Sequence, residues 1–272
     1  MDSCAKDTKG EDMAAGGVAA IRRTRIRKVG AGAPLQWLAG AWGDMGRAPF
    51  AFLFYGLTIG LVSLWFCWAL FRFNAAFWVL ALTCGFVFVA PMLAMGLFEA
   101  GRIIERGGKP SLGRMLFVRD AVRQDIAYLG LALLLIYFLW SRFAQIVYGL
   151  STWRLHRTVE EFIAYAVGTP EGHAMLIAGS IIGGVMAFFT YCLVVVSTPM
   201  LLDRKTNVFV AVATSFGAVA QNFRPLLLWA LIIVAFVLLA AATGFLGFTL
   251  IFPWLGLASW RAYRDLVEAP AA

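Results

Sequence analysis

The sequence predicts an all-α fold, a polytopic membrane helix bundle of about six transmembrane helices with amphipathic helices at the membrane interface. Two observations support this prediction. Hydrophobic residues make up 61% of the chain and charged residues only 14%, which lies outside the range of soluble domains. The apolar residues also form long uncharged runs, and about 20 such residues in a helix are enough to cross the hydrocarbon core.

The chain is expected to divide into a tail, a bundle and a second short tail. Residues 1–34 are polar, rich in Gly and Ala, and basic, so we expect a disordered cytoplasmic tail. The membrane helix bundle is expected at residues 35–266. A short C-terminal tail, residues 267–272, follows it.

Two spans follow an interfacial helix. Apolar residues recur at helical spacing between residues 35 and 47, which predicts a helix lying in the membrane interface. The first uncharged run, residues 48–71, is long enough to cross the membrane with some tilt. A very short turn leads into the second run, residues 73–98, which continues without a break into a charged segment.

The next loop is strongly basic. Met115, Val118, Val122 and Ile126 recur at helical spacing, which predicts a second interfacial helix. The third span begins at Ile126, and Arg142 interrupts its apolar run. Arg142 either reaches out to the outer interface or faces the bundle, and we keep it as a candidate pore or interface charge.

Residues 149–173 are expected to form a sizeable outer segment. Near its end, Thr169 followed by Pro170 is typical of a helix start, with Thr169 as the N-cap and Pro170 at the first helical position. The fourth span then runs uncharged over residues 174–202.

The last apolar stretch is too long for one span. Residues 208–223 show a third amphipathic pattern, and residues 225–260 then carry no charge. A single helix of that length would measure about 54 Å, far more than the hydrocarbon core. The residues from Thr243 to Gly247 predict a break in its middle. Two short spans joined by a tight outer hairpin fit this pattern best, and a kinked helix with a re-entrant end is the alternative.

Basic residues are distributed unevenly about these spans. Of the 23 Lys and Arg residues, 19 fall on the side that holds both termini and 4 on the other. Because basic residues accumulate on the cytoplasmic side, we predict that both termini are cytoplasmic. The same residues favour contact with anionic lipids at that face.

An internal repeat is also suggested by the order of the elements. Three times, an interfacial helix is followed by an inbound span, a turn and a returning span. Each returning span carries a proline near its inner half, at Pro91, Pro199 and Pro253. Residue identity between the units is slight, so the repeat is a pattern of elements.

Two Gly-x-x-x-Gly motifs fall within spans, at Gly56–Gly60 and Gly179–Gly183. Such motifs let helix backbones approach closely. Because glycine is common in membrane helices, we expect packing inside this bundle rather than dimerisation.

Four stretches of the chain resemble the motifs of one family. They are Leu38–Asp44, Phe88–Gly107, Ser197–Arg204 and Pro253–Asp265. Together they make the chain similar to a family of bacterial integral membrane proteins of unknown function. The resemblance implies a polytopic protein of the bacterial inner membrane and no particular chemistry.

The last motif also bears on cofactors. In the resembled family it often carries two histidines, where this chain has Leu257 and Arg261. A metal or haem role that such histidines suggest is therefore not expected here. We predict no cofactor, no metal site and no catalytic residue.

A helix face at the end of the second span is charged. Glu99, Arg102 and Arg106 are separated by three and seven residues, so they lie close to one face. They form either a structural ion network with acids at other helix ends or ordinary surface pairs of little energy. We favour the network, because Glu99 ends a long apolar run. Its candidate residues are Asp44, Glu99, Arg102, Arg106, Asp203 and Asp265.

No sequence motif assigns an enzymatic activity. A nucleophile elbow, a phosphate loop and a His-Glu zinc motif are absent, and the middles of the spans lack the acids and bases that an ion relay needs. We therefore expect an inner-membrane accessory or interaction protein of scaffold type, with a transporter or channel for a small solute as the alternative. The expected partners are the lipid bilayer, anionic lipids and another membrane protein, with no nucleic acid.

Overall fold

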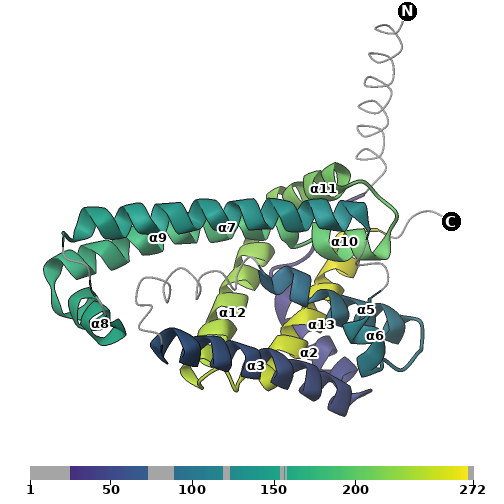
Figure 1. Ribbon diagram of the computed structural model, residues 1–272. Coiled ribbons are helices and arrows are strands. Elements are labelled where there is room, and N and C mark those ends of the chain that lie inside the picture. The colour runs from purple at the N-terminus through teal and green to yellow at the C-terminus, as the bar shows by residue number, and fades with distance from the viewer. Residues whose placement is uncertain (1–24, 73–88, 119–122, 154–155, 157, 269–272) are drawn as a thin grey trace, which may run out of the picture.

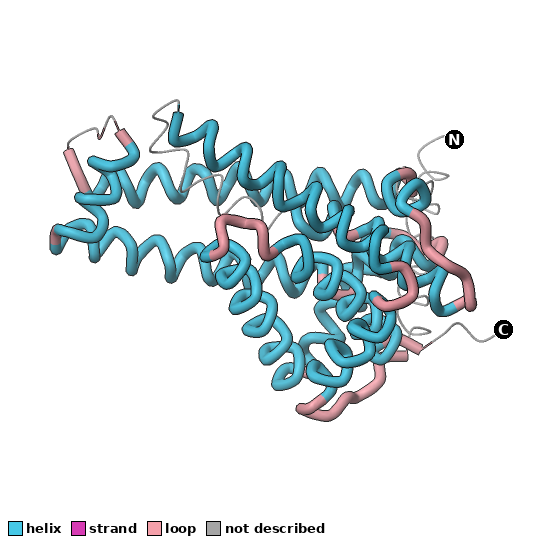
Figure 2. The backbone as a smooth tube through the Cα atoms, turned by 90° about the horizontal axis from the view of Figure 1, so that it is seen from below, coloured by secondary structure: helices cyan, strands magenta, loops and turns pink. Residues whose placement is uncertain are grey.

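The computed structural model describes residues 25–72, 89–118, 123–153, 156 and 158–268, and its regular elements are helices (Figure 1). Short loops join most of these helices (Figure 2). In chain order the helices are α2 (Ala33–Met45), α3 (Pro49–Arg72), α5 (Met95–Glu105), α6 (Leu112–Leu116), α7 (Gln124–Ser151), α8 (Val159–Gly168), α9 (Pro170–Val194), α10 (Ser197–Asp203), α11 (Val208–Gln221), α12 (Phe223–Ala242) and α13 (Phe248–Leu266).

Among the described residues, four helical segments are long and apolar enough to cross a membrane, and they confirm the predicted all-α membrane bundle. They lie in α3, in α7, in α9 with α10, and in α12. Their ranges are Pro49–Ala69, Gln124–Ser151, Pro170–Asp203 and Phe223–Ala242. Most of the second predicted span, residues 73–88, lies outside the described residues.

The uncharged run 225–260 is broken where the sequence predicted a break. Gly244 and Phe245, between α12 and α13, have φ values of 63° and 66°, a left-handed conformation that ends helices. The Thr243 hydroxyl accepts a hydrogen bond from the Gly247 N–H at 2.9 Å and so closes the turn. Two helices joined by a tight turn therefore replace one long helix.

Helix α13 is the central helix of a group that also contains α2, α3 and α5, and it packs against all three (Figure 1). Most of its side chains are buried, including those of Phe248, Trp260 and Tyr263. Its last turns carry charged residues, and α13 is not among the four apolar segments above. The surrounding helices therefore meet on α13.

Helices α7 and α9 form a long hairpin that extends away from α13, with α8 at its far end (Figure 1). The predicted start of α9 is confirmed, because the Thr169 hydroxyl accepts a hydrogen bond from the Gly172 N–H at 3.0 Å and Pro170 is the first helical residue. The Trp140 ring of α7 packs over Gly183 of α9, where an added Cβ would lie 3.0 Å from the ring. The hairpin meets the other described helices near α10 and α11.

Two helix interruptions are satisfied by side chains from other helices. Just before α5, Tyr55 of α3 donates a hydrogen bond to the Leu93 carbonyl at 2.5 Å. Between α9 and α10, the Ser215 hydroxyl of α11 donates to the Cys192 carbonyl at 2.7 Å and accepts from the Val196 N–H at 3.1 Å. Unsatisfied backbone groups are costly inside a bilayer, so these side chains stabilise the interruptions.

Residues 25–32, which the sequence assigned to the disordered tail, lie against the bundle. Ile26 and Val267 form an isolated antiparallel bridge. The buried Asn222 side chain accepts a hydrogen bond from the Val29 N–H at 2.9 Å. These backbone groups therefore have partners in the fold.

The second interfacial helix, expected around residues 115–126, differs from the prediction. Helix α6 ends before Phe117, which has φ −110° and ψ 71° and is not helical. The Met115 carbonyl packs against Gly96 of α5, where a Cβ would collide with it. This tertiary contact overrides the periodic pattern, and residues 119–122 lie outside the described residues.

The Gly-x-x-x-Gly motif of α3 lies against the start of α13. A Cβ on Gly56 would collide with the Thr249 carbonyl, and one on Gly60 would lie 2.8 Å from the Phe245 carbonyl oxygen. The close packing predicted for this motif inside the bundle is confirmed. Gly179 of the second motif, in contrast, would place its Cβ in open space.

We expect Gly56→Ala to destabilise the protein by about 1–3 kcal/mol, because the added methyl group meets rigid backbone and forces α3 away from α13. Thermal unfolding of the purified protein in mild detergent measures this effect. Gly179→Ala is the matched control and should change the midpoint little. Equal midpoints for the two variants would contradict the close approach of α3 and α13.

Candidate functional site

Charged side chains gather where α2, α5, α10 and α13 meet. These helices lie away from α8 (Figure 1). The C-terminal turns of α5, α10 and α13 meet there, and α2 packs alongside α13. Each of these helix ends carries acids and arginines after an apolar stretch. We call the following residues the rim cluster: Asp44, Glu99, Arg102, Glu105, Asp203, Arg204, Arg261, Tyr263 and Arg264.

The most buried ion pair of the rim cluster lies on α5. Glu99 and Arg102 are 2.6 Å apart, with side chains only 7% and 17% exposed. Arg102 also donates to the Leu202 carbonyl of α10 at 3.4 Å, so the pair connects two helices. The exposed Arg114 of α6 approaches Glu99 at 3.6 Å. Glu99 thus neutralises a cation that has little access to solvent.

A second group of contacts joins α5, α10 and α13. The Tyr263 hydroxyl donates to Asp203 at 2.8 Å and accepts from Arg204 at 2.9 Å. Arg264 approaches Asp203 at 3.4 Å and Glu105 at 2.7 Å. Burial, followed by the charge of Asp203, raises the pKa of Tyr263. The phenol therefore keeps its proton at neutral pH and can donate it to Asp203.

A third pair joins α2 to α13. Arg261 donates to the buried Asp44 at 2.6 Å. This hydrogen bond is the main cause that raises the pKa of Arg261. A Cβ on Gly40 would collide with the same guanidinium, so the glycine leaves room for it. One turn further along α13, the exposed Asp265 accepts a hydrogen bond from the Trp37 indole at 2.7 Å.

The six residues predicted as one ion network are distributed over several contacts. Glu99 and Arg102 are paired directly. Asp44 and Asp203 form ion pairs with arginines of α13 instead. Asp265 accepts a hydrogen bond from the Trp37 indole. Arg106 is exposed and takes part in none of the ion pairs found among the described residues.

Arg142, the candidate pore or interface charge, lies apart from the rim cluster. It is exposed on α7, about 27 Å along the helix from Gln124. Its guanidinium donates to Gln145 of the same helix at 2.9 Å. The structure does not bring it together with the six network candidates.

Sequence reasoning missed the partners on α13, namely Arg261, Tyr263 and Arg264. They directly follow the uncharged run 225–260. Both arginines were counted among the basic residues, and Arg261 was noted where the resembled family often carries a histidine, but neither was predicted as an ion-pair partner. A spacing of three residues places both arginines near one face of a helix, which was the available signal.

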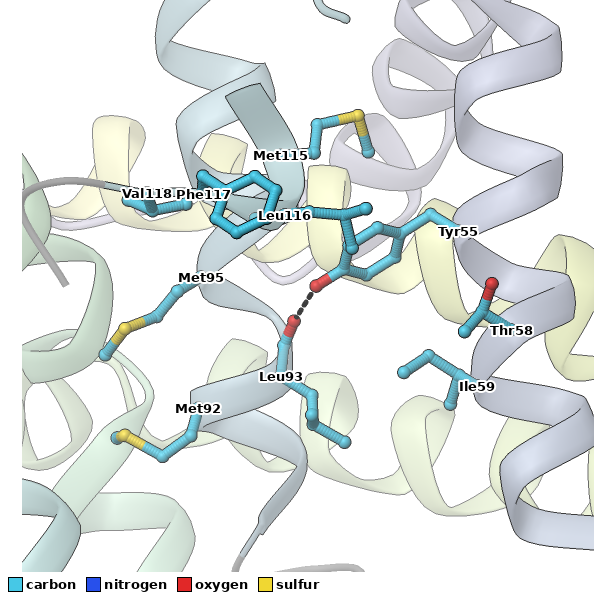
Figure 3. A pocket seen from close by; sticks show the side chains of 11 residues that line it. Tyr55, Thr58, Ile59, Met92, Leu93, Met95, Met115, Leu116, Phe117 and Val118 are labelled. Carbon is cyan, nitrogen blue, oxygen red and sulfur yellow. Dashed lines mark hydrogen bonds between the residues drawn. The ribbon is translucent and has the colours of Figure 1, made fainter. Parts of the chain in front are cut away.

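An apolar cavity of about 620 Å³ adjoins the rim cluster, between α3, α6 and the start of α5 (Figure 3). Tyr55, Thr58, Met95 and Met115 are among its lining residues. Figure 3 shows the Tyr55 hydroxyl directed at the Leu93 carbonyl. Met95 lies one helical turn before Glu99, so the cavity and the rim cluster share α5.

The rim cluster pairs its acids with arginines or hydrogen-bond donors from the same or a neighbouring helix. Among the described residues, no three His, Cys, Asp or Glu side chains are grouped to hold a metal ion. Charge-assisted hydrogen bonds between helix ends are suited to fixing the positions of those ends. The arrangement therefore favours a structural role for these side chains.

Comparison with known proteins agrees with this membrane fold. The model of a family described as predicted integral membrane proteins (DUF2189) matches residues 79–203. The matched stretch contains Phe88–Gly107 and nearly all of Ser197–Arg204, and it confirms the predicted resemblance to a membrane protein family of unknown function. No curated protein and no solved structure matches the chain.

We expect Glu99→Gln to destabilise the protein by about 3–5 kcal/mol, because Arg102 would keep its charge in a largely buried position without an anion. Glu105→Gln is the matched control, since Glu105 is 44% exposed and its ion pair is worth about 1 kcal/mol or less. Thermal unfolding in detergent compares the two. A Glu99→Gln midpoint as high as that of Glu105→Gln would mean that Arg102 does not need its partner.

Proposed function

We propose that this integral membrane protein is an accessory or interaction protein of scaffold type, which acts by contact with another membrane protein. The observation that supports this proposal most directly is how the polar side chains of the candidate spans are used. Several of them, among them those of Thr58, Thr190 and Arg142, bond within their own helices.

Thr58 of α3 and Thr190 of α9 illustrate this use. Each hydroxyl donates to the carbonyl four residues earlier, of Phe54 and Met186 respectively, at 2.9 Å. Arg142 bonds within α7 as well. A charged solute would meet few free polar groups along these helices, and its desolvation would cost several kcal/mol. This favours the accessory role over the alternative of a transporter or channel.

The surface offered for contact is the hairpin of α7 and α9. Because it meets the other described helices mainly near α10 and α11, most of its length has one main neighbour among the described helices, the other arm of the hairpin. Large apolar side chains point outward along it, including Leu135 of α7 at 59% exposure and Ile181 of α9 at 62%. In a bilayer such a surface contacts lipid and is also available to the helices of a partner.

We further propose that the protein lies in the bacterial inner membrane with both termini in the cytoplasm. The described chain ends are adjacent, since the Arg27 N–H donates to the Leu266 carbonyl at 2.8 Å. The uneven distribution of Lys and Arg supports the cytoplasmic assignment and contact with anionic lipids at that face. This orientation puts α8 on the outer side.

Reporter fusions test the orientation. Fusions after Lys109, Lys205 and Asp265 should report the cytoplasm, and a fusion at Glu160 the outer side, because of the bias of basic residues. A fusion at Gly244 should also report the outer side. A cytoplasmic signal at Gly244 would mean that α12 and α13 form a re-entrant segment instead of two crossings.

Site-specific photo-cross-linking in cells tests the accessory role. A photoreactive residue at Leu135 or Ile181 should give an adduct with another membrane protein, because both positions face outward. The same residue at Leu133, which is only 2% exposed on α7, is the matched control and should give no such adduct. Adducts with lipid alone at both exposed positions would contradict a protein contact through the hairpin.

A further inference from the structure

We propose that the cavity of Figure 3 binds one acyl chain of an anionic phospholipid, whose phosphate contacts Arg114. The cavity has a volume of about 620 Å³, within the range of about 300–1,000 Å³ that is usual for small-molecule sites. It lies between a candidate membrane span, α3, and the short helix α6. Both its lining and its surroundings identify the class of ligand.

The lining favours an apolar ligand. The Tyr55 hydroxyl donates to the Leu93 carbonyl at 2.5 Å, and the Thr58 hydroxyl donates to the Phe54 carbonyl at 2.9 Å. Sites for polar ligands carry a few polar groups directed at the ligand. Here both hydroxyls donate their hydrogen bonds to backbone carbonyls instead. A hydrocarbon chain makes no demand for hydrogen bonds.

The methionines of the lining suit a flexible chain. Met92, Met95 and Met115 contribute unbranched, polarisable side chains that adapt to irregular shapes. Figure 3 shows them coming from two segments, before and within α5 for the first two and α6 for the third. An acyl chain with many rotatable bonds matches such a surface better than a rigid ligand does.

The position of α6 favours a membrane lipid as the source of that chain. Leu116 and Phe117 are 53% and 81% exposed and lie two and three residues after the basic Arg114. Exposed apolar side chains beside a basic residue are typical of a segment that lies at the surface of a bilayer. A phospholipid in the same leaflet would therefore have its headgroup near α6 and its chains at the depth of the cavity.

Arg114 has the properties needed to hold the headgroup. Its side chain is 63% exposed, and it approaches Glu99 only at 3.6 Å, while Arg102 holds Glu99 at 2.6 Å. A guanidinium has five N–H donors and binds phosphate through two parallel hydrogen bonds. The proposed orientation determines only which leaflet of the bilayer would supply the lipid. The lipid site does not depend on the proposed accessory role.

Native mass spectrometry of the full chain tests the proposal. Phosphatidylglycerol or phosphatidylcholine with identical acyl chains is added to delipidated protein in mild detergent, and the fraction that carries one lipid is measured. We expect preferential retention of one phosphatidylglycerol. Thr58→Phe should lower this affinity about tenfold, because the larger ring projects into the cavity from an exposed position.

Ser63→Phe is the matched control, since it puts the same ring on α3 at a residue that does not line the cavity. It should retain phosphatidylglycerol as the wild type does. Equal retention by Thr58→Phe and Ser63→Phe, with both variants folded by thermal unfolding, would overturn the cavity as the site.

The headgroup contact is tested separately with Arg114→Gln. Because the Arg114 side chain is exposed, the protein should still fold. The variant should lose the preference for phosphatidylglycerol over phosphatidylcholine and still bind phosphatidylcholine. An unchanged preference would overturn the assignment of Arg114. Neither result depends on the cross-linking outcome, so failure of this site and failure of the accessory role are distinguishable.

Discussion

The fold depends on satisfying backbone polar groups where helices break at membrane depth, because no water is available there to replace a lost hydrogen bond. The break before α5 is satisfied by Tyr55 of α3, and the break between α9 and α10 by Ser215 of α11. Pro253 inside α13 removes a third bond, to the Thr249 carbonyl, which lies against Gly56 of α3. Two of the interruptions are thus tied to α3 and one to α11.

These three interruptions bear on the repeat suggested by the sequence. Pro91, Pro199 and Pro253 each fall close to one of them, as a pattern of three similar units requires. The surroundings of the three breaks differ, however: a phenol bonds to the first and a hydroxyl to the second, while the carbonyl at the third lies against a glycine. The chemistry of the breaks is therefore not repeated along the chain, and the repeat stays a prediction about the order of elements.

Local signals predicted the elements well, and tertiary contacts decided the rest. The start of α9 follows from Thr169 and Pro170, and the break after α12 from the glycines around residue 245, because such signals act over a few residues. The contact of Asp44 with Arg261 joins residues that lie far apart in the chain, and no local pattern specifies it. The contacts of residues 25–32 were missed for the same reason, since their composition resembles a tail and their partners lie near the other end of the chain.

The two contacts of Glu99 explain how the rim cluster and the apolar cavity can act independently although they share α5. The pair with Arg102 is largely buried, so its loss would leave a charge without solvent or a counterion. The pair with Arg114 is longer and solvent-exposed on the side of the arginine, and pairs of this kind contribute little. Arg114 can therefore turn from Glu99 to a phosphate without disturbing the buried pair. In this arrangement, Arg102 connects the ends of α5 and α10, while Arg114 stays available to an anion at the membrane surface.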